Sequence, residues 1–184
     1  MDLDIRAYRE ALGSFPTGVA VVTAAIAADA ANLKIAAGAH IGITVNSFTS
    51  VSLDPPLVLW CMDRKSGRHE LFAAAPAFTV NILGTEHRGV SARLARPGEH
   101  ALDGIALIPT KLGPPELADS LAVFECVREQ AIEAGDHTIL IGRVLRFSRP
   151  SKSAPLVYFG GKYSALAQGR PPEGIGGRRT TDKT

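Results

Sequence analysis

Polar side chains are concentrated in one short run, from Thr44 to Pro56. Its first nine residues hold two threonines, an asparagine and three serines, with Phe48 and Val51 between them and Leu53 directly after. On a strand followed by a turn, such side chains and their backbone N–H groups can converge on a planar, hydrogen-bonding ligand with an anionic tail. A Ser/Thr-rich β-turn without a ligand has the same composition, so the run alone leaves both explanations open.

Two further segments carry groups suited to anion binding and to proton handling. Asp63-Arg64-Lys65-Ser66 places a lysine and a serine at a candidate helix N-terminus, where a phosphate can bind. A solvated turn with Ser66 as an ordinary helix cap explains the same residues. Gly135-Asp136-His137 presents a histidine at the mouth of a strand, where it can orient a ligand or relay a proton. A turn histidine without a role is the alternative.

The fourth segment, Tyr158-Phe159-Gly160-Gly161-Lys162-Tyr163, is aromatic. Its rings can cover a ligand ring system or form an aromatic edge packed on the core. The sequence lacks the motifs that would indicate several other chemistries. The chain has no GxGxxG, P-loop or GxSxG sequence, and neither an HExxH motif nor a His/Cys cluster that would indicate a metal.

The elements that must position these residues are mostly short strands separated by turn residues. The patterns predict strands over 18–24, 40–46, 57–62, 77–83, 106–108, 122–130, 138–147 and 155–159. They predict helices over 4–15, 66–74 and 85–95, and a hairpin connection with a possible short helical piece over 26–39. Apolar residues on both faces of 122–130 and 138–147 suit a barrel wall that is packed inside and covered outside. Many short strands and few helices together predict a β-barrel or a β-sandwich.

The bulk composition is that of one soluble domain. The chain has 184 residues, 46% of them apolar, and a net charge of +2, which gives no basic excess for nucleic-acid binding. Two distant cysteines and the absence of a signal sequence or a membrane-length apolar run predict a cytoplasmic protein without a membrane anchor. We expect one domain over 1–167 and a disordered tail over 168–184, which is rich in Pro, Gly and charge.

Taken together, these segments resemble the flavin reductase-like family with the FMN-binding split-barrel fold. The matching pieces, in the family's order, are the opening helix, Phe15 to Thr23, Gly42 to Val58, Phe78 to Leu83, Gly135 to Thr138, Ile141 to Val144, and Pro155 to Phe159 with Gly161 and Tyr163. They span about residues 4 to 166. The resemblance implies a mainly β, Greek-key split barrel with a few short flanking helices. It also implies a homodimer that binds FMN or FAD near the subunit interface.

The activity that the resemblance implies is direct hydride transfer from NADH or NADPH to the flavin, with reduced flavin passed to a separate oxygenase component. A flavin-binding carrier or sensor without turnover is the alternative, and an oxidase of the same superfamily acting on a pyridoxine-like substrate is a second. The run from Asn46 to Ser50 and the Gly-Asp-His turn favour the reductase.

The family's site residues carry over position by position. Thr44, Asn46 and Ser47 correspond to flavin ring and ribityl contacts; Ser50, Val51 and Ser52 to contacts further along the flavin; Cys61, Lys65 and Ser66 to the second wall and the phosphate end; Asn81 to the closure of the site; and His137 to the nicotinamide side. Val45 and Tyr163 complete the predicted flavin-binding set. His87 departs from a glutamine expected in relatives, and residues 26–39 are longer and richer in alanine than the expected hairpin.

Overall fold

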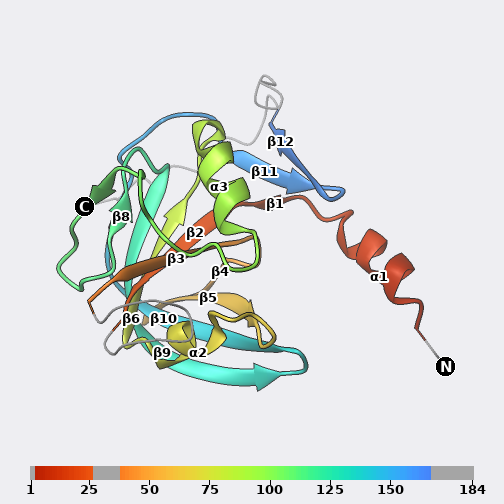
Figure 1. Ribbon diagram of the computed structural model, residues 1–184, viewed down its shortest axis with the longest axis horizontal. Helices are drawn as coiled ribbons and strands as arrows, with labels where there is room; N and C mark the ends of the chain where they lie inside the picture. Colours follow the sequence, from red (N-terminus) through yellow and green to blue (C-terminus); the bar gives the residue numbers. More distant parts are fainter. Residues whose placement is uncertain (1–2, 27–37, 167–184) are drawn as a thin grey trace, which may run out of the picture.

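The computed structural model describes residues 3–26 and 38–166 (Figure 1). Most of the predicted 26–39 connection and the predicted tail over 168–184 lie outside the described residues. The helical elements are α1 (Ile5–Leu12), α2 (His69–Ala74), the 3-10 helix η2 (Thr85–His87) and α3 (Arg88–Leu94). The strands are β1 (Thr17–Gly18), β2 (Ala20–Ala25), β3 (His40–Val45), β4 (Thr49–Leu53), β5 (Pro56–Asp63), β6 (Ala77–Ile82), β7 (Leu107–Ile108), β8 (Glu116–Leu117), β9 (Ala122–Ala134), β10 (His137–Ser148), β11 (Leu156–Phe159) and β12 (Lys162–Ala165).

Seven antiparallel strands form the main sheet in the order β3-β2-β6-β9-β10-β5-β4. Its two edge strands, β3 and β4, are joined by residues 46–48 alone. In a flat sheet these edges would lie about 29 Å apart, whereas four Cα–Cα steps reach at most about 15 Å. The sheet must therefore curl until its edges approach. This curvature, with few short helices, confirms the expected mainly β fold.

The curled sheet encloses the larger hydrophobic core. Trp60 is fully buried there and makes edge-to-face contacts with Phe72 and Phe78, with ring centroids 5.4 Å and 5.9 Å away. A second core lies on the opposite face of β2, because Val22 belongs to the first cluster and Val21 to the second. Leu94 of α3 packs in the second core, which fixes this helix against the outer face of the sheet.

Two local predictions were wrong. The Ser/Thr-rich residues after Asn46 form the edge strand β4 rather than a turn, because their N–H and C=O groups pair with β5. Helix α2 begins at His69 and not at Ser66. The Ser66 hydroxyl instead accepts a hydrogen bond from the Arg68 N–H at 3.3 Å within the preceding turn, so Lys65 and Ser66 do not lie at a helix N-terminus.

Helix α1 forms as predicted but leaves its apolar stripe uncovered. Asp4 caps it by accepting hydrogen bonds from two N–H groups of the first turn. Ile5, Tyr8 and Leu12 are all exposed, and the helix stands apart from the sheet (Figure 1). Strand β10 also differs from the covered wall that was expected, since Leu145 and Phe147 are exposed. Both α1 and β10 thus expose large apolar side chains.

Within residues 3–26 and 38–166, no helix has the length and apolarity needed to cross a bilayer.

Candidate functional site

The outer face of β3 positions the first predicted site residue, Thr44. Side chains alternate along a strand, so Ile43 and Val45 enter the core while Thr44 faces α3. The Thr44 hydroxyl donates to the Ser91 carbonyl at 2.9 Å, and the Ser91 hydroxyl lies 2.8 Å from the Tyr163 hydroxyl. This chain of contacts connects β3, α3 and β12, three elements far apart in the sequence.

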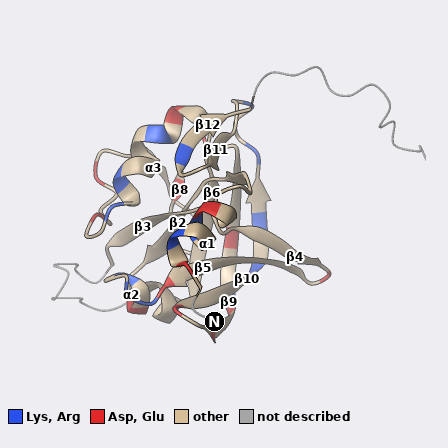
Figure 2. Ribbon diagram, turned by 90° about the vertical axis from the view of Figure 1, so that its right-hand side faces the viewer, with Lys and Arg blue, Asp and Glu red and all other residues tan. Residues whose placement is uncertain are grey.

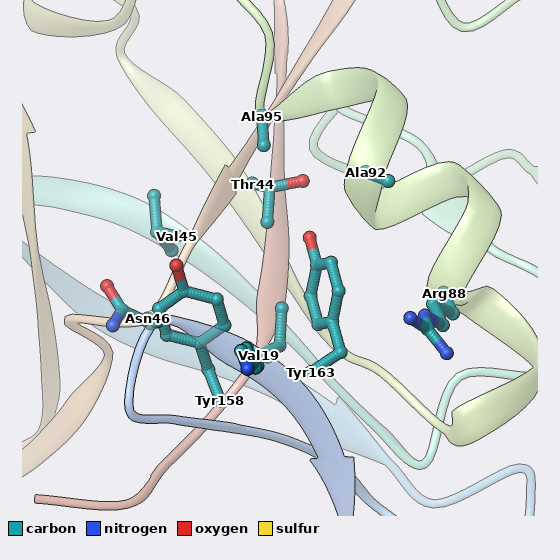
Figure 3. A pocket seen from close by; sticks show the side chains of 11 residues that line it. Val19, Thr44, Val45, Asn46, Arg88, Ala92, Ala95, Tyr158 and Tyr163 are labelled. Carbon is teal, nitrogen blue, oxygen red and sulfur yellow. The ribbon is translucent and has the colours of Figure 1, made fainter. Parts of the chain in front are cut away.

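A cavity of about 630 Å³ opens between these three elements (Figure 3). The lining residues are Val19, Thr44, Val45, Asn46, Arg88, Ala92, Ala95, Tyr158, Gly161, Lys162 and Tyr163. Small side chains on the facing turns of α3 leave the space open, and the volume lies within the range of small-molecule sites. Three predicted flavin-binding residues of β3 and its end, together with Tyr163, therefore come together here.

Aromatic rings and cations form one side of this first cavity. The rings of Tyr158 and Tyr163 lie 5.6 Å apart at 70° to each other. The Arg88 guanidinium lies 5.8 Å from the centre of the Tyr163 ring, on the side away from Tyr158 (Figure 3). Lys162 adds a second positive charge. This end can take a flat ring and an anionic group.

A second cavity, of about 330 Å³, adjoins the first and shares Thr44 and Ala95 with it. Its other lining residues are Ile43, Asp63, Lys65, Ser66, Gly67, Arg68, Pro97, Gly98 and His100. The predicted phosphate residues Lys65 and Ser66 thus share a cavity with Thr44 although they do not lie at a helix N-terminus. The Asp63 carboxylate accepts the Lys65 N–H at 2.8 Å, which shapes the turn that presents both residues.

Ser47 and Cys61 connect the end of β3 with β5. The Ser47 hydroxyl accepts a hydrogen bond from the Cys61 N–H at 2.9 Å. Burial raises the pKa of the Cys61 thiol, and the hydrogen bond with Ser47 opposes this shift. Both residues are half-buried and lie outside the two cavities. In the described chain they hold the β3–β4 connection against β5.

The β4 half of the predicted motif lies elsewhere. Ser50 and Val51 are exposed and Ser52 is half-buried, and none of the three lines either cavity. Figure 2 shows β4 free of charged residues up to the turn that follows it. Strand β4 pairs with β5, and the register of this pairing shifts between Ser50 and Ser52.

Asn81 is fully buried, and its amide is used by the protein itself. The amide nitrogen donates to the Val21 carbonyl at 3.1 Å, and the amide oxygen accepts the Leu117 N–H at 2.8 Å. Asn81 lines neither cavity. Its visible function is to join β2, β6 and β8, so we do not carry it into the proposed flavin site.

His137 begins β10 directly after the two-residue turn Gly135-Asp136, in which Gly135 has a φ of 63°. A glycine at the first position suits a type II′ hairpin turn. The His137 ring is 43% exposed, and its Nδ1 lies 2.7 Å from the Asp136 carboxylate. This hydrogen bond lowers the pKa of Asp136. His137 lines neither cavity, but it pairs across the sheet with Asp63, which lines the second.

Sequence reasoning missed several lining residues. Arg88 and Ala92 come from α3, Ala95 is its C-cap, and Arg68 and His100 come from the turns around the second cavity. The small residues at positions 92 and 95 recur at a helical spacing, which is the only local signal for a face that approaches a ligand. His87 is buried, and its Nε2 lies 3.0 Å from the Ala118 carbonyl, apart from both cavities.

Comparison with known proteins places this site in a family. Residues 12–167 match the flavin reductase like domain. The chain is 42% identical over 163 residues to the FMN reductase (NADH) SmoA of Agrobacterium fabrum, covering 89% of this chain and 87% of that protein. It is also 42% identical over 144 residues to the stachydrine N-demethylase reductase subunit Stc3 of Rhizobium meliloti, covering 78% of this chain and 59% of that protein.

A solved structure agrees with the sequence comparisons. The NADH:FAD oxidoreductase SgcE6 of Streptomyces globisporus, in complex with NAD and FAD fragments, superposes with a TM-score of 0.78 at 31% identity. The match covers 91% of this chain and 98% of that one. The curled sheet, the paired cavities on β3 and these matches lead to one conclusion: the chain belongs to the flavin reductase-like family.

Proposed function

We propose that this protein is an NAD(P)H-dependent flavin reductase that binds FMN or FAD along the outer face of β3. The observation that carries this proposal is the pair of adjoining cavities that share Thr44. One has apolar and aromatic walls and the other has cations and a serine hydroxyl. A flavin mononucleotide requires this combination, a wall for its ring and donors for its phosphate. The names of SmoA and SgcE6 support the same chemistry.

The donor set fits a flavin at both ends. Val19 and the small face of α3 provide apolar cover, and the exposed Asn46 amide can pair with a polar ring edge. Lys65 forms no ion pair within the described residues, so its ammonium is free to bind a phosphate beside the Ser66 hydroxyl. The bound flavin supplies the redox chemistry by accepting a hydride from NAD(P)H. The protein supplies binding, orientation and exclusion of water.

His137 would position the nicotinamide of the hydride donor. Its Nδ1 hydrogen bond with Asp136 orients the ring and leaves Nε2 as the free nitrogen. Substitution of His137 by Ala should therefore lower NAD(P)H turnover and leave flavin affinity unchanged. Equal turnover in the variant and the wild type would contradict this assignment.

Steady-state reduction with each pairing of FMN, FAD, NADH and NADPH tests the proposed activity. We expect loss of NAD(P)H absorbance that depends on both protein and flavin. The measurement also identifies the preferred pair. Flavin binding without turnover in all four pairings would instead support a carrier or sensor. Absence of both binding and turnover would reject a flavin function.

We further propose that the protein is a homodimer. Val51, Leu53, Leu145 and Phe147 are exposed apolar residues on β4 and β10, the two strands that flank β5, and Leu53 is 93% exposed. Helix α1 has only eight residues and would be marginal without a packing partner. A second copy of the chain would cover such surface.

Phe147→Asp should shift the molar mass measured by light scattering from a dimer towards a monomer. Ile108→Asp is the matched control, since Ile108 is an exposed apolar residue on β7, which belongs to a separate two-stranded sheet. A wild-type protein that is monomeric at micromolar concentration would rule out the dimer.

The name of Stc3, a reductase subunit, supports a separate oxygenase as the recipient of reduced flavin. If this holds, reduced flavin must leave the protein. Anaerobic ultrafiltration after one turnover should then recover reduced flavin in the filtrate. Complete retention with the protein would indicate a bound cofactor instead of a released product.

A further inference from the structure

The second cavity is built on an arginine that is buried without a carboxylate partner. Arg68 is 6% exposed, and no ion pair among the described residues includes it. Its guanidinium donates to the carbonyl oxygens of Gly42 at 3.2 Å and Leu94 at 3.0 Å. It also donates to the carbonyls of Glu99 and, at 3.4 Å, of Arg96.

These four carbonyls belong to two separate segments, and other residues of both segments line the second cavity. Gly42 belongs to β3, and Leu94, Arg96 and Glu99 belong to the end of α3 and the segment after it. The same segment supplies Pro97, Gly98 and His100 to the cavity lining. A guanidinium has five N–H donors in a fixed plane, so one side chain can hold both segments in one geometry.

The buried positive charge of Arg68 also affects which ligands the second cavity favours. Burial lowers the pKa of Arg68, although an arginine stays protonated at neutral pH. Carbonyl dipoles solvate the guanidinium, and no carboxylate of residues 3–26 and 38–166 lies within ion-pair distance of it. Such a buried cation is costly by itself and favours an anion nearby. The open side of this cavity, where Lys65 also lies, is the place for that anion.

We propose that Arg68 is a positioning residue that makes the second cavity selective for the phosphate of the flavin. This inference rests on the proposed flavin-binding function. Arg68 acts through the 94–100 segment and through its charge, while Lys65 and Ser66 contact the phosphate. The protein should consequently prefer FMN to riboflavin, which differs only in lacking the phosphate.

The dissociation constants of FMN and riboflavin, measured by fluorescence titration, test this role. We expect the wild type to favour FMN and Arg68→Met to lower FMN affinity by about tenfold or more. Riboflavin affinity should change by less than about threefold, because the ring site on β3 stays intact. Arg93→Met is the matched control. Arg93 also donates to backbone carbonyls, those of Asp103 at 3.0 Å and Ala101 at 3.3 Å, but lies outside the cavity.

Arg68→Lys keeps the proposal testable if Arg68→Met does not fold. Lysine keeps the charge but loses the planar fork, so the preference for FMN should fall part of the way. Inorganic phosphate should compete with FMN, but not with riboflavin, and should do so less well in this variant.

Three outcomes would overturn the role of Arg68. The first is an equal loss of affinity for FMN and riboflavin in Arg68→Met. The second is an unchanged preference for FMN over riboflavin in Arg68→Lys. The third is a wild type that binds FMN and riboflavin equally well. The last of these leaves the proposed reductase function intact. Failure of the wild type to bind either flavin would instead reject that function.

Discussion

The predicted motif from Thr44 to Pro56 divides into two halves that the fold treats differently. In the β3 half, Thr44 contacts α3 through a 2.9 Å hydrogen bond, and two cavities open beside it. In the β4 half, Ser50 and Val51 are exposed on an edge strand of the sheet. Similar residue types thus form a covered wall in one half and an open surface in the other. Composition shows that both halves are polar, whereas the packing of α3 makes only the β3 half the wall of two cavities.

The largest expected effect tests how closely α3 and its following segment cover β3. A Cβ at Gly42 would lie 2.7 Å from Leu102 Cδ2 and 3.1 Å from Leu94 Cδ1. Gly42→Ala should therefore lower the free energy of unfolding by about 1–3 kcal/mol, measured by urea denaturation. Gly18→Ala is the control, because a Cβ there meets nothing within 4 Å. Equal stability of the two variants would mean that β3 is covered less tightly than described.

A smaller effect tests the connection between the halves. Ser47→Ala removes the acceptor of the Cys61 N–H and leaves that group partly buried without a partner. The free energy of unfolding should fall by about 1–2 kcal/mol. Alkylation of the Cys61 thiol should also become faster, since the segment that holds β5 is loosened. The Cys126 thiol provides the internal standard, because burial raises its pKa to about 12. Unchanged stability and labelling would show that the connection is held by other contacts.

Removing one hydroxyl from each half of the motif tests whether the β3 half contributes more to stability than the β4 half. Thr44→Val loses the hydrogen bond to Ser91 and should cost about 1 kcal/mol of stability, with weaker FMN binding. Thr44→Ser should restore both. Ser50→Ala should change the free energy of unfolding by less than about 0.5 kcal/mol, because Ser50 is exposed. A larger stability loss in Ser50→Ala than in Thr44→Val would reverse the assignment of the two halves.

The smallest effect concerns His137, which is exposed to solvent like Ser50 and Val51 of β4. Its hydrogen bond lowers the pKa of Asp136. His137→Asn should let that pKa rise towards the ordinary value for an aspartate, as followed by carboxyl NMR titration. A lowered folded-state pKa stabilises the fold above the unfolded-state value, and this contribution is lost as the pH falls through the folded-state pKa. Asp136 is fully exposed, so acid stability should hardly differ between the two proteins. An unchanged Asp136 pKa would remove the basis for assigning the His137 tautomer.

Local patterns were sufficient for the elements whose signal lies within a few residues. The apolar runs of β2 and β6, the alternation of β5, the Gly135 turn and the Asp4-capped helix were all readable, because their signals lie within a few neighbouring residues. The start of α2 could not be predicted from the local sequence, since Ser66 accepts a hydrogen bond within a turn instead of capping the helix. Strand β4 was also missed, because its pairing partner decides between a strand and a turn.

The fold class, the family resemblance and the residue types that a flavin requires could all be predicted from the order of the residues. Which of these residues share a cavity depends on how distant segments pack together. The tertiary structure brought Lys65, Thr44 and Tyr163 to one face of β3, placed Asn81 in the core and left Ser50 outside. It also revealed Arg68, whose four carbonyl partners lie 26 to 31 residues away in the chain. Contacts at such separations depend on how the sheet curls and where α3 packs, and no local pattern records either of these.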